Sequence, residues 1–162
     1  MFRTLRRKSQ LLPEAETIAM LESCSSGVLA VSGDDGYPYA VPLSYAYEDG
    51  TIYFHCARSG HKIDAIERAD KVSFCVIAAD DVQPDTFTTH FRSAVAFGRA
   101  RILTDDAEKR HALQLLVLKY SPGYIAEGDA AIAEEWDNTC TVEVRIEHLT
   151  GKAATEIIDQ KK

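Results

Sequence analysis

Alternation of apolar and polar residues is the dominant pattern along this chain, and it predicts a protein built mainly from β-strands. The clearest case is the segment from Tyr39 to Tyr47, in which every second residue is apolar or aromatic. Strands are predicted over residues 27–31, 39–47, 51–56, 71–78, 92–103 and 139–149. Tight turns at 32–36 and 48–50 separate the first three strands, which predicts an antiparallel meander.

Four segments have helical periodicity instead. They are residues 13–24, 59–68, 105–120 and a shorter turn at 130–136. Six antiparallel strands with a few helices predict a mainly β fold with peripheral helices, and a closed barrel is expected because closure removes exposed strand edges. Side chains fill the interior of a small barrel, so a flat cofactor would sit on its outside, where two subunits meet.

Composition predicts one globular domain spanning residues 1–162, because 46% of the residues are hydrophobic and 27% are charged. No apolar run approaches the roughly 20 residues of a membrane span. The net charge of −7 argues against a general nucleic-acid binder. An N-terminal arm, residues 1–12, is nevertheless basic, with Arg3, Arg6, Arg7 and Lys8. A basic arm can bind nucleic acid or a membrane, but we favour a solvated tail or an arm that grips an acidic partner subunit.

The four cysteines favour a cytoplasmic protein with reduced thiols. Cys24, Cys56, Cys75 and Cys140 include no CxxC pair, and the N-terminus lacks the apolar core of a secretory signal. Cys75 and Cys140 lie in strand patterns and are expected in the core. No His/Cys set has the spacing of a zinc site, so no metal is expected.

The most informative stretch is residues 53–62, where an apolar strand runs into a Ser-Gly turn that opens a helix. Unpaired N–H groups at a helix start attract anions. Arg58 and Lys62 bracket them with charge, and Ser59 adds a hydroxyl. We interpret this turn as a phosphate site for a phosphorylated cofactor. The structural alternative is an ordinary helix cap followed by polar surface residues.

Two further positions support a cofactor site. Pro42 interrupts a regular strand, which marks a bulge or an edge with free backbone groups suited to a heteroaromatic ring. Ser93 begins a strand whose second face consists of small residues, so another backbone or a flat ligand could approach closely. The alternatives are a plain edge strand at Pro42 and a water-facing hydroxyl at Ser93.

Together these runs resemble the pyridoxamine 5′-phosphate oxidase-like split-barrel flavoproteins, and most closely their nitroimidazole-resistance branch. The segments that carry the resemblance are 37–45, 52–57, 60–62 and 91–100, with Arg6-Arg7 and Thr150-Gly151-Lys152. The resemblance implies a six-stranded antiparallel split β-barrel that forms a homodimer, with FMN at each of two interface sites.

The cofactor-binding positions that the resemblance implies are Val41, Pro42, Leu43, Ser44, His55, Cys56, Ser59, Gly60, His61, Lys62 and Ser93. Residues 41–44 would meet the ring and ribityl chain, and residues 59–62 would hold the phosphate. The phosphate pair is His-Lys rather than Arg-Lys, and a glutamine expected near Ser93 is absent. Trp136 lies before the last strand, so the Trp and Arg pair that reads pyridoxine phosphate has no counterpart. These departures argue against vitamin oxidation.

A flavin would supply the redox chemistry. The working hypothesis is an oxidoreductase that reduces a small aromatic or nitro compound stacked on the flavin, with Tyr39, Tyr45 or the partner subunit's Trp136 forming a wall over that face. His55 is the candidate proton donor, because histidine titrates near neutral pH; its alternative is a hydrogen-bonded structural role. The competing functions are a non-catalytic flavin carrier or sensor, and haem binding through His90 on a loop. FAD could use the same phosphate site.

Overall fold

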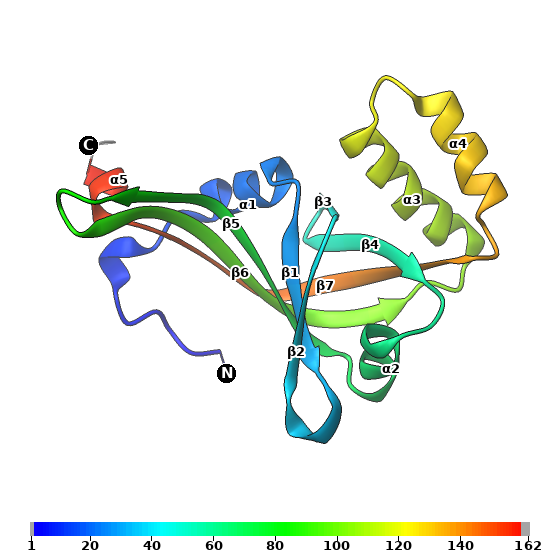
Figure 1. The fold of residues 1–162 in the computed structure, drawn as a ribbon, viewed down its shortest axis with the longest axis horizontal. Coiled ribbons are helices and arrows are strands. Elements are labelled where there is room, and N and C mark those ends of the chain that lie inside the picture. Colours follow the sequence, from blue (N-terminus) through cyan, green and yellow to red (C-terminus); the bar gives the residue numbers. More distant parts are fainter. Residues whose placement is uncertain (1, 160–162) are drawn as a thin grey trace.

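The computed structural model describes residues 2–159 and places seven strands in one antiparallel sheet with helices at its periphery (Figure 1). The strands are β1 (Gly27–Ser32), β2 (Pro38–Leu43), β3 (Ala46–Glu48), β4 (Thr51–Ala57), β5 (Lys71–Gln83), β6 (Thr88–Ile102) and β7 (Thr139–Ala153). The helices are α1 (Glu14–Ser23), α2 (His61–Arg68), α3 (Asp106–Tyr120), α4 (Ile125–Glu134) and α5 (Thr155–Asp159), with short 3₁₀ turns η1 (Lys8–Gln10) and η2 (Asp34–Gly36). The predicted mainly β class with peripheral helices is confirmed.

The strand order is β2-β1-β5-β6-β7-β4-β3. Both hairpins of the predicted meander are present, because β1 pairs with β2 and β3 pairs with β4, but the predicted middle strand is divided and its two parts lie at opposite ends of that order. Pro42 lies in β2, an edge strand, as its missing N–H predicts. Only Ser44 and Tyr45 separate β2 from β3, so the chain itself holds these two edge strands within roughly 10 Å of each other there.

Tyr45 explains why the predicted strand 39–47 is two strands and the sheet has seven. Its backbone N–H donates to the Tyr120 hydroxyl at 2.8 Å, so a side chain of α3 replaces a strand partner. The Tyr45 ring is fully buried, and its hydroxyl donates to the Leu21 carbonyl at 2.6 Å. Tyr45 is therefore a core residue, and its predicted role as a wall of the ligand site is wrong.

The β5–β6 hairpin extends further than the sequence indicates. The predicted strand ends at residue 78, but residues 80–83 continue β5, with Asp80 opposite Phe91 and Asp81 opposite His90. The ladder satisfies the backbone groups of these exposed acidic residues, whose composition alone favours a loop. His90 consequently lies within β6 and not on a loop between strands.

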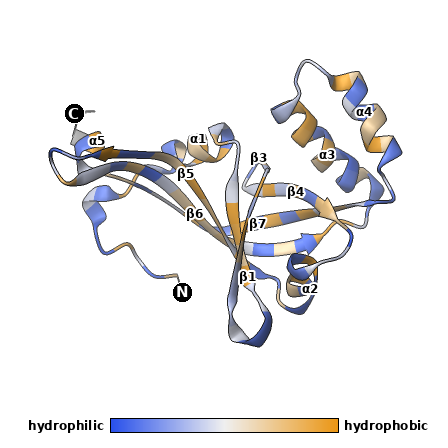
Figure 2. Cartoon of the chain, viewed as in Figure 1, coloured by the Kyte–Doolittle hydropathy of each residue, from blue (hydrophilic) through white to orange (hydrophobic). Residues whose placement is uncertain are grey.

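The small residues of β6 let the chain pack against itself. Ala94, Ala96 and Ala100 are buried, and a side chain at Gly98 would overlap the carbonyl oxygen of Arg145 in β7. The close neighbour is thus another strand and not a flat ligand. Hydrophobic and hydrophilic residues alternate along the strands, as the periodicity predicts (Figure 2).

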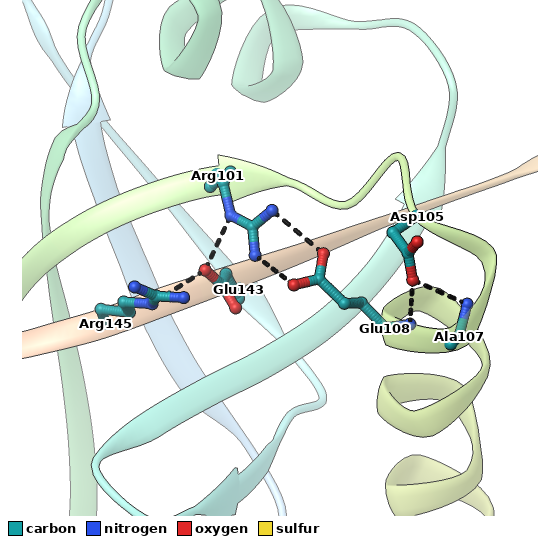
Figure 3. Close-up of polar contacts among 6 residues, drawn as sticks. All are labelled: Arg101, Asp105, Ala107, Glu108, Glu143 and Arg145. Atoms are coloured by element: carbon teal, nitrogen blue, oxygen red, sulfur yellow. Dashed lines mark hydrogen bonds and ion pairs between the residues drawn. The ribbon is translucent and has the colours of Figure 1, made fainter.

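A charged cluster joins the outer parts of β6, β7 and α3. Glu143 is only 6% exposed; it accepts a hydrogen bond from Arg101 Nε at 2.9 Å and forms an ion pair with Arg145 Nε at 3.1 Å. Arg101 also binds Glu108 through both terminal nitrogens (Figure 3). Asp105 caps α3 by accepting from the N–H groups of Ala107 and Glu108, while the Glu108 side chain turns to Arg101 and does not complete a capping box.

The basic arm contacts the sheet near its two ends, while its basic residues are exposed to solvent. The Phe2 ring stacks on His148 of β7, with 4.7 Å between ring centroids, and Leu12 is buried. The Leu12 N–H donates to the Gly151 carbonyl at 3.0 Å. Arg6, Arg7 and Lys8 point to solvent. None of the helices described between residues 2 and 159 has the length and apolar character needed to cross a membrane.

Candidate functional site

The turn between β4 and α2 is open and glycine-dependent. Gly60 is the N-cap of α2 and has a φ of 130°, a conformation that other residues rarely adopt. A Cβ at Gly60 would meet no atom within 4 Å, so the space beside the turn is free. Ser59 and Gly60 are both exposed. The turn therefore has the room that a bound phosphate requires.

The start of α2 offers backbone donors to this space. The N–H groups of Ile63 and Asp64 donate to the Gly60 carbonyl at 2.8 and 3.1 Å. Those of His61 and Lys62 precede them and have no hydrogen-bond partner among residues 2–159. Such orphan groups at a helix start favour an anion.

The His61 side chain is held by the β1–β2 hairpin. Its ring stacks on Tyr39, with 4.1 Å between ring centroids, and Nε2 lies 3.5 Å from a carboxylate oxygen of Asp34. Arg68, the last residue of α2, forms an ion pair with the same carboxylate at 2.8 Å. The side chain of His61 thus anchors α2, and the group it offers to the turn is its backbone N–H.

Lys62 and Arg58 both lie near the end of β4 but differ in their partners. The Lys62 charge acts on the thiol of Cys56, which places it beside the end of β4. Arg58 instead donates from Nη1 to the Asp137 carbonyl at 2.9 Å, before the start of β7. The two cations therefore do not bracket the turn equally, and Lys62 is the cation available to a phosphate there.

A groove of about 780 Å³ lies between the α3–α4 hairpin and the sheet. It contains two residues that the sequence indicates: Ser44, from the link between β2 and β3, and His55, from β4. Its other walls are apolar and aromatic side chains with two carboxylates, chiefly Leu113, Leu116, Val117, Tyr120, Tyr124, Ile132, Glu127 and Glu135. Such a cavity suits an organic molecule with an apolar body.

Sequence reasoning missed the contribution of α4. The expected turn at 130–136 is a helix that begins at Ile125, and it supplies one wall of the groove. Gly128 lets α4 approach α3, because a side chain there would overlap Val117. The signal available in the sequence was the stretch Ala130-Ala131-Ile132-Ala133 beside this glycine, which favours a helix.

His55 is the titratable residue that the sequence predicts and the groove contains. It lies opposite Thr141 in the β4–β7 ladder. His55 is exposed at the edge of the groove, and partial burial of its ring lowers the pKa of His55 below the usual histidine value. The neutral imidazole is therefore its dominant form at neutral pH.

The groove and the turn lie within reach of one ligand. His55 lines the groove, and Ser59 follows it by four residues, which corresponds to about 13 Å of extended chain. At the other end, the Tyr39–His61 contact aligns β2 with α2. The structure thus brings residues 41–44 and 55–62 together, with Pro42 and Ser44 exposed and Val41, Leu43 and Cys56 half-buried.

Ser93 lies apart from these residues within one chain. It is opposite Lys152 of β7, whereas His55 is opposite Thr141 of the same strand. The separation from 141 to 152 is roughly 36 Å along an extended strand. Trp136 is also engaged elsewhere, since Lys109 Nζ and the Arg110 guanidinium lie 4.5 and 4.9 Å from its ring centroid.

Comparison with known proteins identifies the family of this chain. Residues 13–153 match the family of pyridoxamine 5′-phosphate oxidase. No curated protein has a sequence that matches the chain.

Several solved structures share the fold. One is a candidate 5-nitroimidazole antibiotic resistance protein from Bacteroides thetaiotaomicron, 23% identical over 88% of this chain and 85% of that one, with a TM-score of 0.74. A flavocytochrome from Azotobacter vinelandii is 21% identical over 94% of this chain and 72% of that one, with a TM-score of 0.81. An FAD-binding protein from Mesorhizobium loti is 26% identical over 90% of this chain and 97% of that one, with a TM-score of 0.64. The family match covers most of the sequence, and the chain therefore belongs to the pyridoxamine 5′-phosphate oxidase family.

Proposed function

We propose that this protein binds FMN, with the phosphate at the β4–α2 turn and the ring toward the groove beside His55. The observation that carries the proposal is the open turn at Gly60, with the free N–H groups of His61 and Lys62, next to a cavity that contains Ser44 and His55. A doubly charged phosphate would receive backbone hydrogen bonds and the Lys62 charge, which together exceed what either supplies alone.

The structural relatives support a flavin in this fold. One is an FAD-binding protein and another a flavocytochrome. FAD could use the same turn for its first phosphate if the adenosine end points to solvent. Haem binding through His90 has less support, because His90 lies in β6 opposite Asp81 and does not line the groove.

We also propose that the protein is an oxidoreductase that reduces a small aromatic or nitro compound in the groove. A bound flavin would supply the electrons, and the protein would supply position and a proton. The apolar walls from α3 and α4 would hold an aromatic ring, and Tyr124 adds an exposed aromatic face. His55 would donate the proton from its imidazolium form, which is the minor form at neutral pH because the pKa of His55 is lowered.

A second copy of the chain would complete the site. Ser93 is far from the turn within one chain, so it can contact the same flavin only from another subunit. We therefore propose a homodimer with the cofactor at its interface. Sedimentation of flavin-loaded protein tests this, and a monomer that retains bound flavin contradicts it.

The absorbance spectrum of the purified protein, with mass spectrometry of the released ligand, tests the cofactor. A flavin spectrum and the mass of FMN are expected; colourless protein that added FMN does not reconstitute contradicts the proposal. Stopped-flow reduction by NAD(P)H and reoxidation by a nitroimidazole then tests catalysis. Flavin that exchanges electrons with neither would identify a passive carrier or sensor. Unchanged turnover in His55→Ala would remove His55 from the mechanism.

A further inference from the structure

Two cysteines from different strands lie directly opposite each other at the end of β4. Cys56 of β4 is the ladder partner of Cys140 of β7. Directly opposed residues in an antiparallel pair have Cα atoms about 4.5–5.5 Å apart, and their side chains project to the same face. A disulfide needs Cα atoms about 4.4–6.8 Å apart. The backbone therefore already holds this pair at a bonding separation, while both cysteines are present as free thiols.

The thiols interact with each other and with flanking cations. A hydrogen bond between them raises the pKa of Cys56 and lowers the pKa of Cys140. Lys109 of α3 and Arg58 after β4 also favour the Cys140 thiolate, and Glu67 of α2 opposes it. Cys140 is therefore the more nucleophilic member, because the thiolate is the reactive form of cysteine.

Cys140 can be reached by a small molecule although it is only 9% exposed. It lines a cavity of about 370 Å³ that is separate from the groove beside His55. Arg58, Lys109, Trp136 and Asp137 form part of its walls. This cavity gives a small polar oxidant a path to the buried sulfur without opening the sheet.

We propose that Cys56 and Cys140 are a reversible dithiol–disulfide pair whose oxidant is a hydroperoxide, with hydrogen peroxide as the simplest case. The Cys140 thiolate attacks one peroxide oxygen, the O–O bond breaks, and the departing hydroxide takes a proton to become water. Cys140 is then a sulfenic acid. The Cys56 sulfur attacks the Cys140 sulfur, an S–S bond replaces the S–O bond, and the hydroxyl leaves as water with the Cys56 proton. The two thiols are oxidised, and one peroxide is reduced to two waters.

The pair lies where a change in its oxidation state would affect the β4–α2 turn. Cys56 precedes Ser59 of the β4–α2 turn by three residues, and β4 pairs with β7 there through the backbone ladder and the Arg58–Asp137 hydrogen bond. A covalent link at this position fixes the end of the strand that leads into the turn. The proposal does not depend on flavin binding, because the strand register alone brings the two sulfurs together.

Peroxide treatment of the purified chain, followed by intact mass and peptide mapping without reductant, tests the proposal. We expect the loss of two hydrogen masses, one cross-linked peptide pair containing Cys56 and Cys140, and full recovery with dithiothreitol. Cys140→Ser should abolish the cross-link. Cys24→Ser and Cys75→Ser should retain it, because neither residue is a ladder partner of another cysteine. Wild-type protein that keeps all its thiols, or that forms a cross-link involving Cys24 or Cys75, would overturn the proposal without bearing on the flavin site.

Discussion

The rings of Tyr39 and His61 stack with 4.1 Å between their centroids and 20° between their planes. Tyr39 belongs to β2 and His61 begins α2, so this contact joins the two segments that the sequence separately associates with a flavin. It fixes the start of α2, and therefore the backbone donors of the turn, against the β1–β2 hairpin. The stack is thus expected to position the turn without contacting the phosphate itself.

Loss of the Tyr39 ring should weaken FMN binding and stability together. Tyr39→Ala removes a stacked pair whose contribution is about 0.5–1.5 kcal/mol beyond its buried area. Tyr39→Phe retains the stack and should bind FMN as the wild type does. Fluorescence titration with FMN and urea unfolding measure both effects. Equal FMN affinity in all three proteins would show that the stack does not position the turn.

Acid should destabilise the protein partly through His55. Burial holds its pKa in the folded chain below the unfolded value of about 6.5, so the unfolded chain takes up a proton first as the pH falls. The contribution of neutral His55 is complete above that value and is lost as the pH decreases below it. His55→Gln should therefore lose less unfolding free energy than the wild type between pH ~7.5 and ~5.5. The same loss in both proteins, measured by urea unfolding, would contradict a burial effect at His55.

The β6–β7 packing predicts a strong effect of one methyl group. Gly98→Ala places a Cβ against the Arg145 carbonyl oxygen, which belongs to the backbone and cannot rotate away. We expect a loss of about 1–3 kcal/mol of unfolding free energy or more, as for other overpacked sites. Gly123→Ala is the matched control, because a Cβ there meets nothing within 4 Å, and it should change stability by less than about 0.5 kcal/mol. Similar stability of the two variants would contradict the register of β6 on β7.

The buried carboxylate of Glu143 should contribute more to the free energy of unfolding than an exposed carboxylate does. Glu143→Gln leaves Arg101 and Arg145 beside a neutral group, and the loss is discounted to about 1–2 kcal/mol because both arginines are largely solvated. Glu147→Gln removes an exposed partner of Arg99 and should reduce the free energy of unfolding less than Glu143→Gln does. Thermal and urea unfolding of the two variants measure the difference. An equal or larger effect at Glu147 would contradict the account.

Local patterns predicted the elements well and their arrangement poorly. Alternation located the strands, and Pro42 correctly indicated an edge. The division of 39–47 was not predictable, because it depends on a hydroxyl from Tyr120, 75 residues away in sequence. The pairing of β1 with β5 is likewise a long-range choice that tight turns do not encode.

In the candidate site, too, the features set by neighbouring residues were predictable, whereas the contacts between segments distant in sequence were not. The Ser-Gly turn and its following helix are local, and the structure contains both. The engagement of His61 by Asp34 and Tyr39, and of Arg58 by Asp137, depends on segments that meet only in the folded chain. Nothing in the spacing of residues 106–134 indicated that α3 and α4 would enclose a groove over β4.

The phosphate account rests on Lys62 and the backbone donors of α2. Lys62→Ala removes one charge-assisted interaction of about 1.5–3 kcal/mol, so FMN binding should weaken by about ten- to a hundredfold. Lys71→Ala is the control, because Lys71 is exposed at the start of β5, and its FMN affinity should match that of the wild type.

The most direct measurement compares the dissociation constants of FMN and riboflavin, which differ only by the phosphate, in wild type and Lys62→Ala. The wild type should bind FMN at least about tenfold more tightly than riboflavin, and Lys62→Ala should lose much of that preference. Equal binding of FMN and riboflavin by the wild type, or an undiminished preference in Lys62→Ala, would contradict the phosphate site at the β4–α2 turn.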